Sequence, residues 1–166
     1  MPQATAQTLV SQMIVVEHIR VSSEQSFAEV RVKLESALPI LDTGIVSALR
    51  NGDQNYVLDY EETGPKLSIF DCRDHGALLQ IDGRKCHAVQ YEIGNPVTAS
   101  KMTRHKLSAA LYAPLRVVLL EDMQGRGVFE YDRPSTLFGQ YDDERVTKVG
   151  RYLDAALETV LRKAAE

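Results

Sequence analysis

An adjacent carboxylate and imidazole, Asp74 and His75, are the residues of this sequence best suited to acid–base chemistry. Histidine titrates near neutral pH, and a neighbouring carboxylate can orient its ring or raise its pKa. Side chains adjacent in sequence often cannot reach each other, however, and a loop residue can instead cap a helix. The pair therefore allows catalysis, ligand contact or a structural role, and the structural role is favoured.

Four potential zinc ligands lie near this pair in the sequence, namely Cys72, His75, Cys86 and His87. Two thiols and two imidazoles form a suitable ligand set for zinc. Their spacing matches no zinc finger or ribbon, and the side chains of Cys86 and His87 would point to opposite faces of a strand. We therefore expect buried structural cysteines with one surface histidine, no metal and no cofactor.

A Gly94-Asn95-Pro96 corner is a second candidate site. Backbone N–H groups at the start of a following helix can bind an anion, and Lys101, Arg104 and His105 would add positive charge. Proline supplies no N–H, however, and it keeps Asn95 out of the helical region. A rigid turn that fixes the angle between strand and helix is therefore the favoured interpretation.

Arg116 interrupts an apolar strand predicted over residues 115–120. A charge is rarely buried without a partner, so either Arg116 pairs across a hairpin or the second face of its strand is wet or lines a cavity. The candidate partners are acidic residues of that hairpin, namely Glu121, Glu130 and Asp132. Aromatic rings that could line the same space, or pack in the core, are Tyr91, Tyr112 and Tyr131.

Composition indicates one ordinary globular domain. The chain has 166 residues, of which 44% are hydrophobic and 25% charged. A net charge of −4 argues against a nucleic-acid partner. No apolar run approaches the roughly 20 residues that span a bilayer, and the N-terminus does not resemble a signal peptide. We expect a cytoplasmic protein without a membrane partner, with a disordered lead-in over residues 1–12 and a single α+β domain over residues 13–166.

The first elements follow from residue type and periodicity. Residues 13–21 are rich in β-branched side chains and alternate in polarity, which predicts a strand. Ser22 and Gln25 have the spacing of a capping box and predict the start of a helix. Its apolar stripe is Phe27, Val30, Leu34 and Leu38, and Pro39 ends it.

The later elements place strands together and helices near the ends of the chain. In order they are two short helices within residues 42–63, a strand over 67–70, a helical turn or hairpin over 74–81, a strand over 86–93, a helix over 98–110, a hairpin of strands over 115–120 and 128–131, and a final helix capped by Asp142 or Asp143. This order favours an α+β two-layer sandwich over a doubly wound parallel fold.

An ordered set of residues resembles the family known as domain of unknown function 302 (DUF302). The set comprises Phe70, Asp74-His75, Gly94-Asn95-Pro96, Met102, Leu111, Pro114-Leu115-Arg116-Val117, Glu121 and Gly125. The resemblance covers about residues 13–164. It implies a TATA-binding-protein-like fold, with a curved, mostly antiparallel sheet and helices on one side, and it implies a homodimer. The family supplies no accepted reaction, so no catalytic residue is carried across. The chain departs from the family in Ala113, where leucine is common, and in its extended segment 42–63.

Three hypotheses of function follow. The first is a small-ligand-binding module that acts as a homodimer and holds its ligand between the sheet and a helix. Its candidate ligand-binding residues are Asp74, His75, Tyr91, Asn95 and Arg116. The second is an enzyme, a hydrolase or isomerase, that uses Asp74 and His75 in a cleft. The third is a structural or interaction protein without a small ligand.

Overall fold

A five-stranded antiparallel sheet forms one layer of the computed structural model, which describes residues 7–166. The strands lie in the order β1-β5-β4-β3-β2, and every neighbouring pair is antiparallel. Their bounds are His18–Ser26 (β1), Ser68–Asp74 (β2), Ala88–Gly94 (β3), Leu115–Glu121 (β4) and Arg126–Asp132 (β5).

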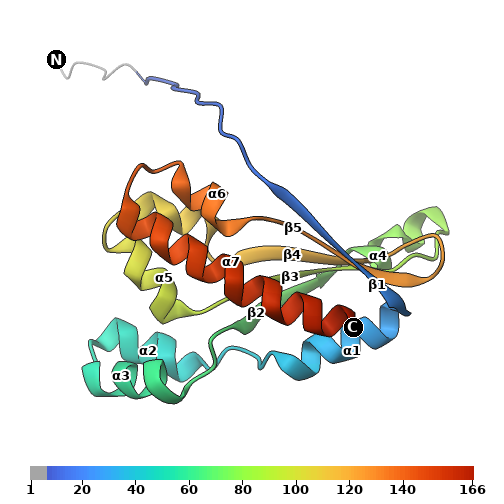
Figure 1. Ribbon diagram of the computed structural model, residues 1–166, viewed down its shortest axis with the longest axis horizontal. Helices are drawn as coiled ribbons and strands as arrows, with labels where there is room; N and C mark the ends of the chain where they lie inside the picture. The colour runs from blue at the N-terminus through green and yellow to red at the C-terminus, as the bar shows by residue number, and fades with distance from the viewer. Residues whose placement is uncertain (1–6) are drawn as a thin grey trace.

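Helices form the second layer on one side of this sheet. In Figure 1, α7 crosses the face of the sheet and α1 lies beside its C-terminal half. The α-helices are Phe27–Ala37 (α1), Thr43–Asn51 (α2), Gln54–Thr63 (α3), His75–Leu78 (α4), Pro96–Thr103 (α5), Pro134–Gly139 (α6) and Glu144–Ala165 (α7), with 3-10 turns at Leu79–Asp82 and Leu107–Tyr112. The predicted α+β class, with an antiparallel sheet and helices on one side, is confirmed.

The core lies between the two layers. Tyr91, Leu119 and Phe129 point from three neighbouring strands toward the helices and are fully buried. Alternate residues of the same strands face away from the helices, as the two-residue period of a strand requires. From α7, Leu153, Leu157 and Leu161 close the core, so the predicted final helix is confirmed. Asp143 caps α7 through a bond from the Arg145 N–H to its side chain.

The first helix begins four residues later than predicted. Ser26, not Ser22, is the N-cap of α1, and it forms a full capping box with Glu29. The sequence contains two consecutive signals of the form Ser-x-x-Gln/Glu, and β1 occupies the first of them because residues 18–22 pair with β5. The apolar stripe of α1 is as predicted.

Other strands and helices also begin or end at residues that differ from the prediction. β1 begins at His18 rather than residue 13, because His18 lies opposite Asp132, the last residue of its partner β5. The helix predicted over 98–110 is α5 followed by a 3-10 turn, and α5 starts earlier than predicted because Pro96 suits the first helical turn. α6, with Pro134 at its start, was not predicted.

The structure also bears on the predictions about membrane-spanning segments and about the N-terminal lead-in. Within residues 7–166, no helix is long and apolar enough to cross a membrane. Residues 1–6 of the predicted lead-in lie outside the described part of the chain. Residues 7–12 belong to an extended segment that leads into β1.

Candidate functional site

The five predicted ligand-binding residues do not form one site. Tyr91 points to the helix-covered face of the sheet and is fully buried. Arg116 lies on the other face, where it is exposed and stands opposite Glu92 in register. Asp74 and His75 lie at the far end of β2, and Asn95 lies at the start of α5. Each must therefore be judged by its own surroundings.

Tyr91 joins the sheet to α1. Its hydroxyl donates a hydrogen bond of 2.8 Å to Oε1 of Glu35, which also accepts from Nε of Arg31 at 2.9 Å. Burial, and then the bond to Glu35, raise the pKa of Tyr91 well above the usual value of 10. The sheet–helix interface is filled at this point, so Tyr91 serves packing and tethering.

Asp74 caps a helix instead of orienting His75. The Asp74 Oδ1 atom accepts a hydrogen bond of 2.9 Å from the N–H of Ala77, in the first turn of α4. The His75 side chain is exposed, and in the part of the chain that the structure describes no hydrogen bond joins it to Asp74. The geometry agrees with the structural role favoured for this pair.

The four potential zinc ligands are dispersed. Within residues 7–166, no group of three or more histidine, cysteine or acidic side chains is placed to hold a metal ion. Cys72 and Cys86 are both free thiols. Cys72 is exposed, so the expectation that both cysteines are buried was wrong. It lies on β2, at the edge of the sheet. His87 stacks on Phe27 with ring centroids 5.1 Å apart.

Arg116 belongs to a wet, charged face of the sheet. On this face Arg73 pairs with Glu92 at 2.8 Å, and His18 pairs with Asp132 at 2.9 Å. Arg116 has no ion pair with any residue in the range 7–166, and it is exposed. Of the two alternatives for this residue, the wet second face is the one that the structure has. Exposed pairs of this kind contribute little to stability.

Asn95 holds the Gly-Asn-Pro corner in place. Its Oδ1 accepts hydrogen bonds from the N–H groups of Val97 and Thr98, at 2.9 and 3.1 Å. Its Nδ2 donates to the carbonyl oxygen of Pro65 at 3.0 Å. The N–H groups that could have cradled an anion are therefore engaged by the chain itself, in agreement with a rigid turn.

Beside this corner lies a hollow of about 370 Å³ that we call the lysine pocket. Its walls come from the end of α3, the loop at 64–66, the start of α5 and the middle of α7. The lining residues are Tyr60, Glu61, Gly64, Pro65, Lys66, Asn95, Val97, Thr98, Lys101, Lys148, Val149 and Tyr152.

Local sequence builds the walls of the lysine pocket. Asp53 caps α3 by accepting from the N–H of Tyr56 at 3.1 Å, and Gly64 ends this helix with a bond to the carbonyl of Tyr60. A Cβ at position 64 would come within 2.6 Å of that carbonyl oxygen. Only glycine lets the chain turn this closely over Tyr60, so the loop at 64–66 can reach α5.

The charge of the lysine pocket is positive, although the whole chain carries −4. Lys101 forms an ion pair with Glu61, the one acidic residue of the lining. Lys66 and Lys148 are exposed and have no ion-pair partner within residues 7–166. The pocket thus presents two uncompensated ammonium groups to whatever enters it.

One further polar group of this pocket lacks a partner. The hydroxyl of Tyr60 is buried and makes no hydrogen bond with any residue in the described range, although its residue lines the pocket. A buried hydroxyl without a bond is unfavourable by roughly 1–3 kcal/mol. The oxygen is buried, however, so this hydroxyl is not presented to a ligand in the pocket as the lysines are.

Sequence reasoning found only part of this pocket. Asn95 and Lys101 were singled out, but Lys66 and Lys148 were not. Each is a single lysine in an otherwise unremarkable segment, and only the packing of the 64–66 loop against α5 and α7 brings them together. No local pattern in the sequence marks that convergence.

Several of the residues that carry the family resemblance line a second feature. A narrow apolar crevice of about 60 Å³ lies next to the lysine pocket, between the ends of β2, β3 and β4 and the helices α5 and α7. Its lining includes Phe70, Gly94, Asn95, Met102, Pro114 and Leu115. A Cβ at Gly94 would lie 3.4 Å from Pro114. These residues pack the sheet against α5. This packing positions α5, which forms one wall of the lysine pocket.

Comparison with known proteins gives a family and a fold. A family model described as domain of unknown function DUF302 matches residues 61–164. This match is shorter than the expected 13–164. The chain is also similar to a solved structure, the uncharacterized conserved protein DUF302 from Bacillus stearothermophilus, with a TM-score of 0.65 and 16% identity over 89% of this chain and 97% of that one. That likeness shows the fold. No curated protein matches the chain.

Proposed function

The chain belongs to the DUF302 family, and on this premise we propose that it is a small-ligand-binding module whose site is the lysine pocket. No reaction is known for the family, so the class of ligand is inferred from the residues that line the lysine pocket. The ligand is a small molecule with one or two negatively charged groups, carboxylate or phosphate. The observation that carries this proposal is the set of three lysines around a hollow whose lining has a single glutamate.

Charge selects the class of ligand. Lys66 and Lys148 extend from separate elements to the same hollow, and Lys101 is held there by Glu61. Like charges that converge without an acidic partner repel one another, so a bound anion relieves that repulsion. An ammonium group also donates up to three charge-assisted hydrogen bonds to such an anion.

The remaining lining suits the uncharged part of a ligand. Val97, Val149 and the ring of Tyr152 offer apolar contact area, and the Thr98 side chain can hydrogen-bond. A volume of about 370 Å³ lies within the usual range for small-molecule sites. The pocket therefore fits a compact organic acid or phosphate ester better than an extended polymer.

Native mass spectrometry of protein taken directly from cells tests this proposal. The expected result is a small acidic adduct that is lost in a Lys66→Ala, Lys148→Ala double variant. A Lys85→Ala variant is the control, because Lys85 is an exposed lysine outside the pocket. An adduct that survives in the double variant would place the binding site elsewhere.

The proposal includes a cytoplasmic setting and a homodimer. Cys72 and Cys86 are free thiols, a state that a reducing compartment maintains. The dimer is supported by the exposed apolar side chains of the segment before β1, namely Leu9, Val10, Met13 and Val15.

A second candidate function is that of an interaction protein without a small ligand. The filled interface between Tyr91 and Glu35 favours it, because no ligand can enter between sheet and helix there. The enzyme alternative has no comparable support, since the Asp74 carboxylate caps α4.

A further inference from the structure

An extended segment before β1 carries four of the exposed large hydrophobic residues of the described chain. We call residues 7–16 the arm. Leu9, Val10, Met13 and Val15 in the arm are 96%, 83%, 95% and 91% exposed. Figure 1 shows the arm projecting away from the sheet and helices. Contiguous exposed apolar surface of this kind marks an interaction site.

The arm is fixed only where it meets the body of the protein. At Glu17 the carbonyl accepts from the Arg133 N–H at 2.8 Å, and the N–H donates to Oγ1 of Thr136 at 3.2 Å. No hydrogen bond or ion pair joins residues 7–16 to residues 17–166. The direction of the arm is therefore set by β1. Ile14 and Val16 are partly buried, whereas Leu9, Val10, Met13 and Val15 are left exposed.

Both faces of the arm are apolar. Side chains alternate along an extended chain, so Leu9, Met13 and Val15 continue the face of β1 that carries Ile19 and Val21. Val10, Ile14 and Val16 lie on the opposite face. Strands that are apolar on both faces are typically covered on both sides.

The sheet has two edges, and only one of them is blocked. At the β2 edge, Ile69 donates to the Pro39 carbonyl at 2.8 Å and accepts from the Leu41 N–H at 2.9 Å. A bulge between Ile69 and Asp71 further disrupts that edge. β1 lies at the other edge, and in the described part of the chain no strand pairs with its outer side.

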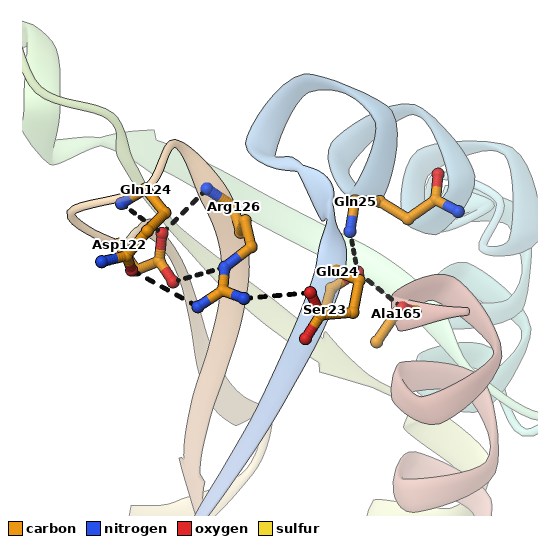
Figure 2. A network of polar contacts seen from close by, with 7 residues as sticks. All are labelled: Ser23, Glu24, Gln25, Asp122, Gln124, Arg126 and Ala165. Atoms are coloured by element: carbon orange, nitrogen blue, oxygen red, sulfur yellow. Dashed lines mark hydrogen bonds and ion pairs between the residues drawn. The ribbon is translucent and has the colours of Figure 1, made fainter.

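The far end of β1 is held firmly. Figure 2 shows Arg126 reaching from the β4–β5 hairpin to Glu24, and Ser23 bonded to the carbonyl of Ala165 at the end of α7. The Arg126 and Glu24 side chains are 3.0 Å apart. β1 is thus a fixed edge strand whose free continuation is the arm.

We propose that the arm binds a second copy of this chain, pairing antiparallel with the open edge of the partner's β1. The same edge of each chain contributes equally, as a two-fold dimer requires. The arm and β1 are of similar length, roughly 30 Å each at about 3.3 Å per residue, so each arm spans the partner's strand. The two sheets then join into one.

The alternation of side chains between the two faces of a strand supports this arrangement. Residues directly opposite each other in a sheet share a face, so Met13 and Val15 lie beside the partner's Ile19 and Val21. At roughly 100 Å² for each apolar side chain, the four exposed residues of both arms and the surfaces they cover account for about 1,600 Å². That is the size of a standard stable interface.

Sedimentation equilibrium of the full chain tests the proposal. The wild type is expected to show twice the 18.5 kDa mass of one chain. A Met13→Glu, Val15→Glu variant is expected to raise the dimer dissociation constant by roughly 100-fold, because four carboxylates would have to leave water. The monomer should keep its circular dichroism spectrum, since Met13 and Val15 are exposed in the single chain.

A Met123→Glu, Leu107→Glu variant is the matched control. Both residues are apolar and exposed, at 95% and 79%, and lie outside the proposed interface. This variant should remain dimeric. A monomeric wild type, an arm variant that dimerises as tightly as the wild type, or a control that dissociates equally would each overturn the proposal.

Hydrogen exchange gives an independent readout. Peptides that cover residues 7–22 should gain protection as the wild-type protein is concentrated. Protection that appears only on another surface, or that is the same at every concentration, would overturn the role of the arm.

Discussion

The side-chain amide of Asn95 donates a hydrogen bond to the carbonyl oxygen of Pro65 at 3.0 Å. The oxygen of the same side chain caps α5 through Val97 and Thr98. Asn95 therefore fixes the helix against the 64–66 loop, and these are two walls of the lysine pocket. The Gly-Asn-Pro corner acts on the pocket by positioning its walls.

Replacing Asn95 should destabilise the fold. Asn95→Ala removes the cap of α5 and the bond to Pro65, and a cap alone contributes about 1 kcal/mol. We expect a loss of roughly 1–2 kcal/mol in the free energy of unfolding, measured by urea titration. Asn95→Asp keeps the capping oxygen but loses the amide donor, so its loss should be smaller. An unchanged urea midpoint in Asn95→Ala would contradict this account.

The bond between Tyr91 and Glu35 should stabilise the sheet–helix interface. Tyr91→Phe removes the hydroxyl and leaves Glu35 bonded to Arg31. A net loss of about 1 kcal/mol is expected from urea or thermal unfolding. Tyr152→Phe is the control because that ring is 44% exposed. Equal stability of Tyr91→Phe and the wild type would show that the bond contributes nothing.

His18 should titrate above its ordinary pKa of 6.5, chiefly because it bonds to Asp132. A raised pKa means that this bond stabilises the folded protein below about pH 6.5, and that the stabilisation is lost as the pH rises through the folded-state pKa. Proton NMR of the imidazole measures the pKa directly. Asp132→Asn should lower it toward 6.5.

Asp71→Asn is the control for that titration. Asp71 lies on the same exposed face, on β2, at the other edge of the sheet from His18. Four strand spacings of about 4.8 Å separate them, which exceeds the Debye length of about 8 Å at physiological salt. The pKa of His18 should not change in this variant. An equal shift in both variants would mean that the bond to Asp132 is not the cause.

The sequence predicted the fold where a signal extended over many residues. The apolar stripe of α7 runs through the whole helix, so the helix was predicted, and Asp143 is one of the two caps that the sequence allowed. At α1 the capping signals at Ser22 and Ser26 compete, and pairing of β1 with β5 decides between them. α6 was missed because six residues are too few to show a helical period.

The candidate site was less predictable, because a strand pattern does not say which face meets the helices. The sequence allowed Tyr91 either to share a space with Arg116 or to pack in the core. The two residues lie on opposite faces of the sheet, and Tyr91 is in the core. Lys66 and Lys148 carry no local signal and meet only after α7 packs beside the 64–66 loop. Convergence of distant single residues is a property of tertiary packing.

Isothermal titration calorimetry with citrate and inorganic pyrophosphate as anionic probes tests the central claim most directly. We predict that the wild-type protein binds at least one of them at a single site. Lys66→Ala, Lys148→Ala should weaken that binding by roughly 100-fold, as expected for losing two charge-assisted contacts, whereas Lys85→Ala should leave it unchanged. Binding of equal strength in the double variant, or no binding of either anion by the wild type, would contradict the lysine pocket as an anion site.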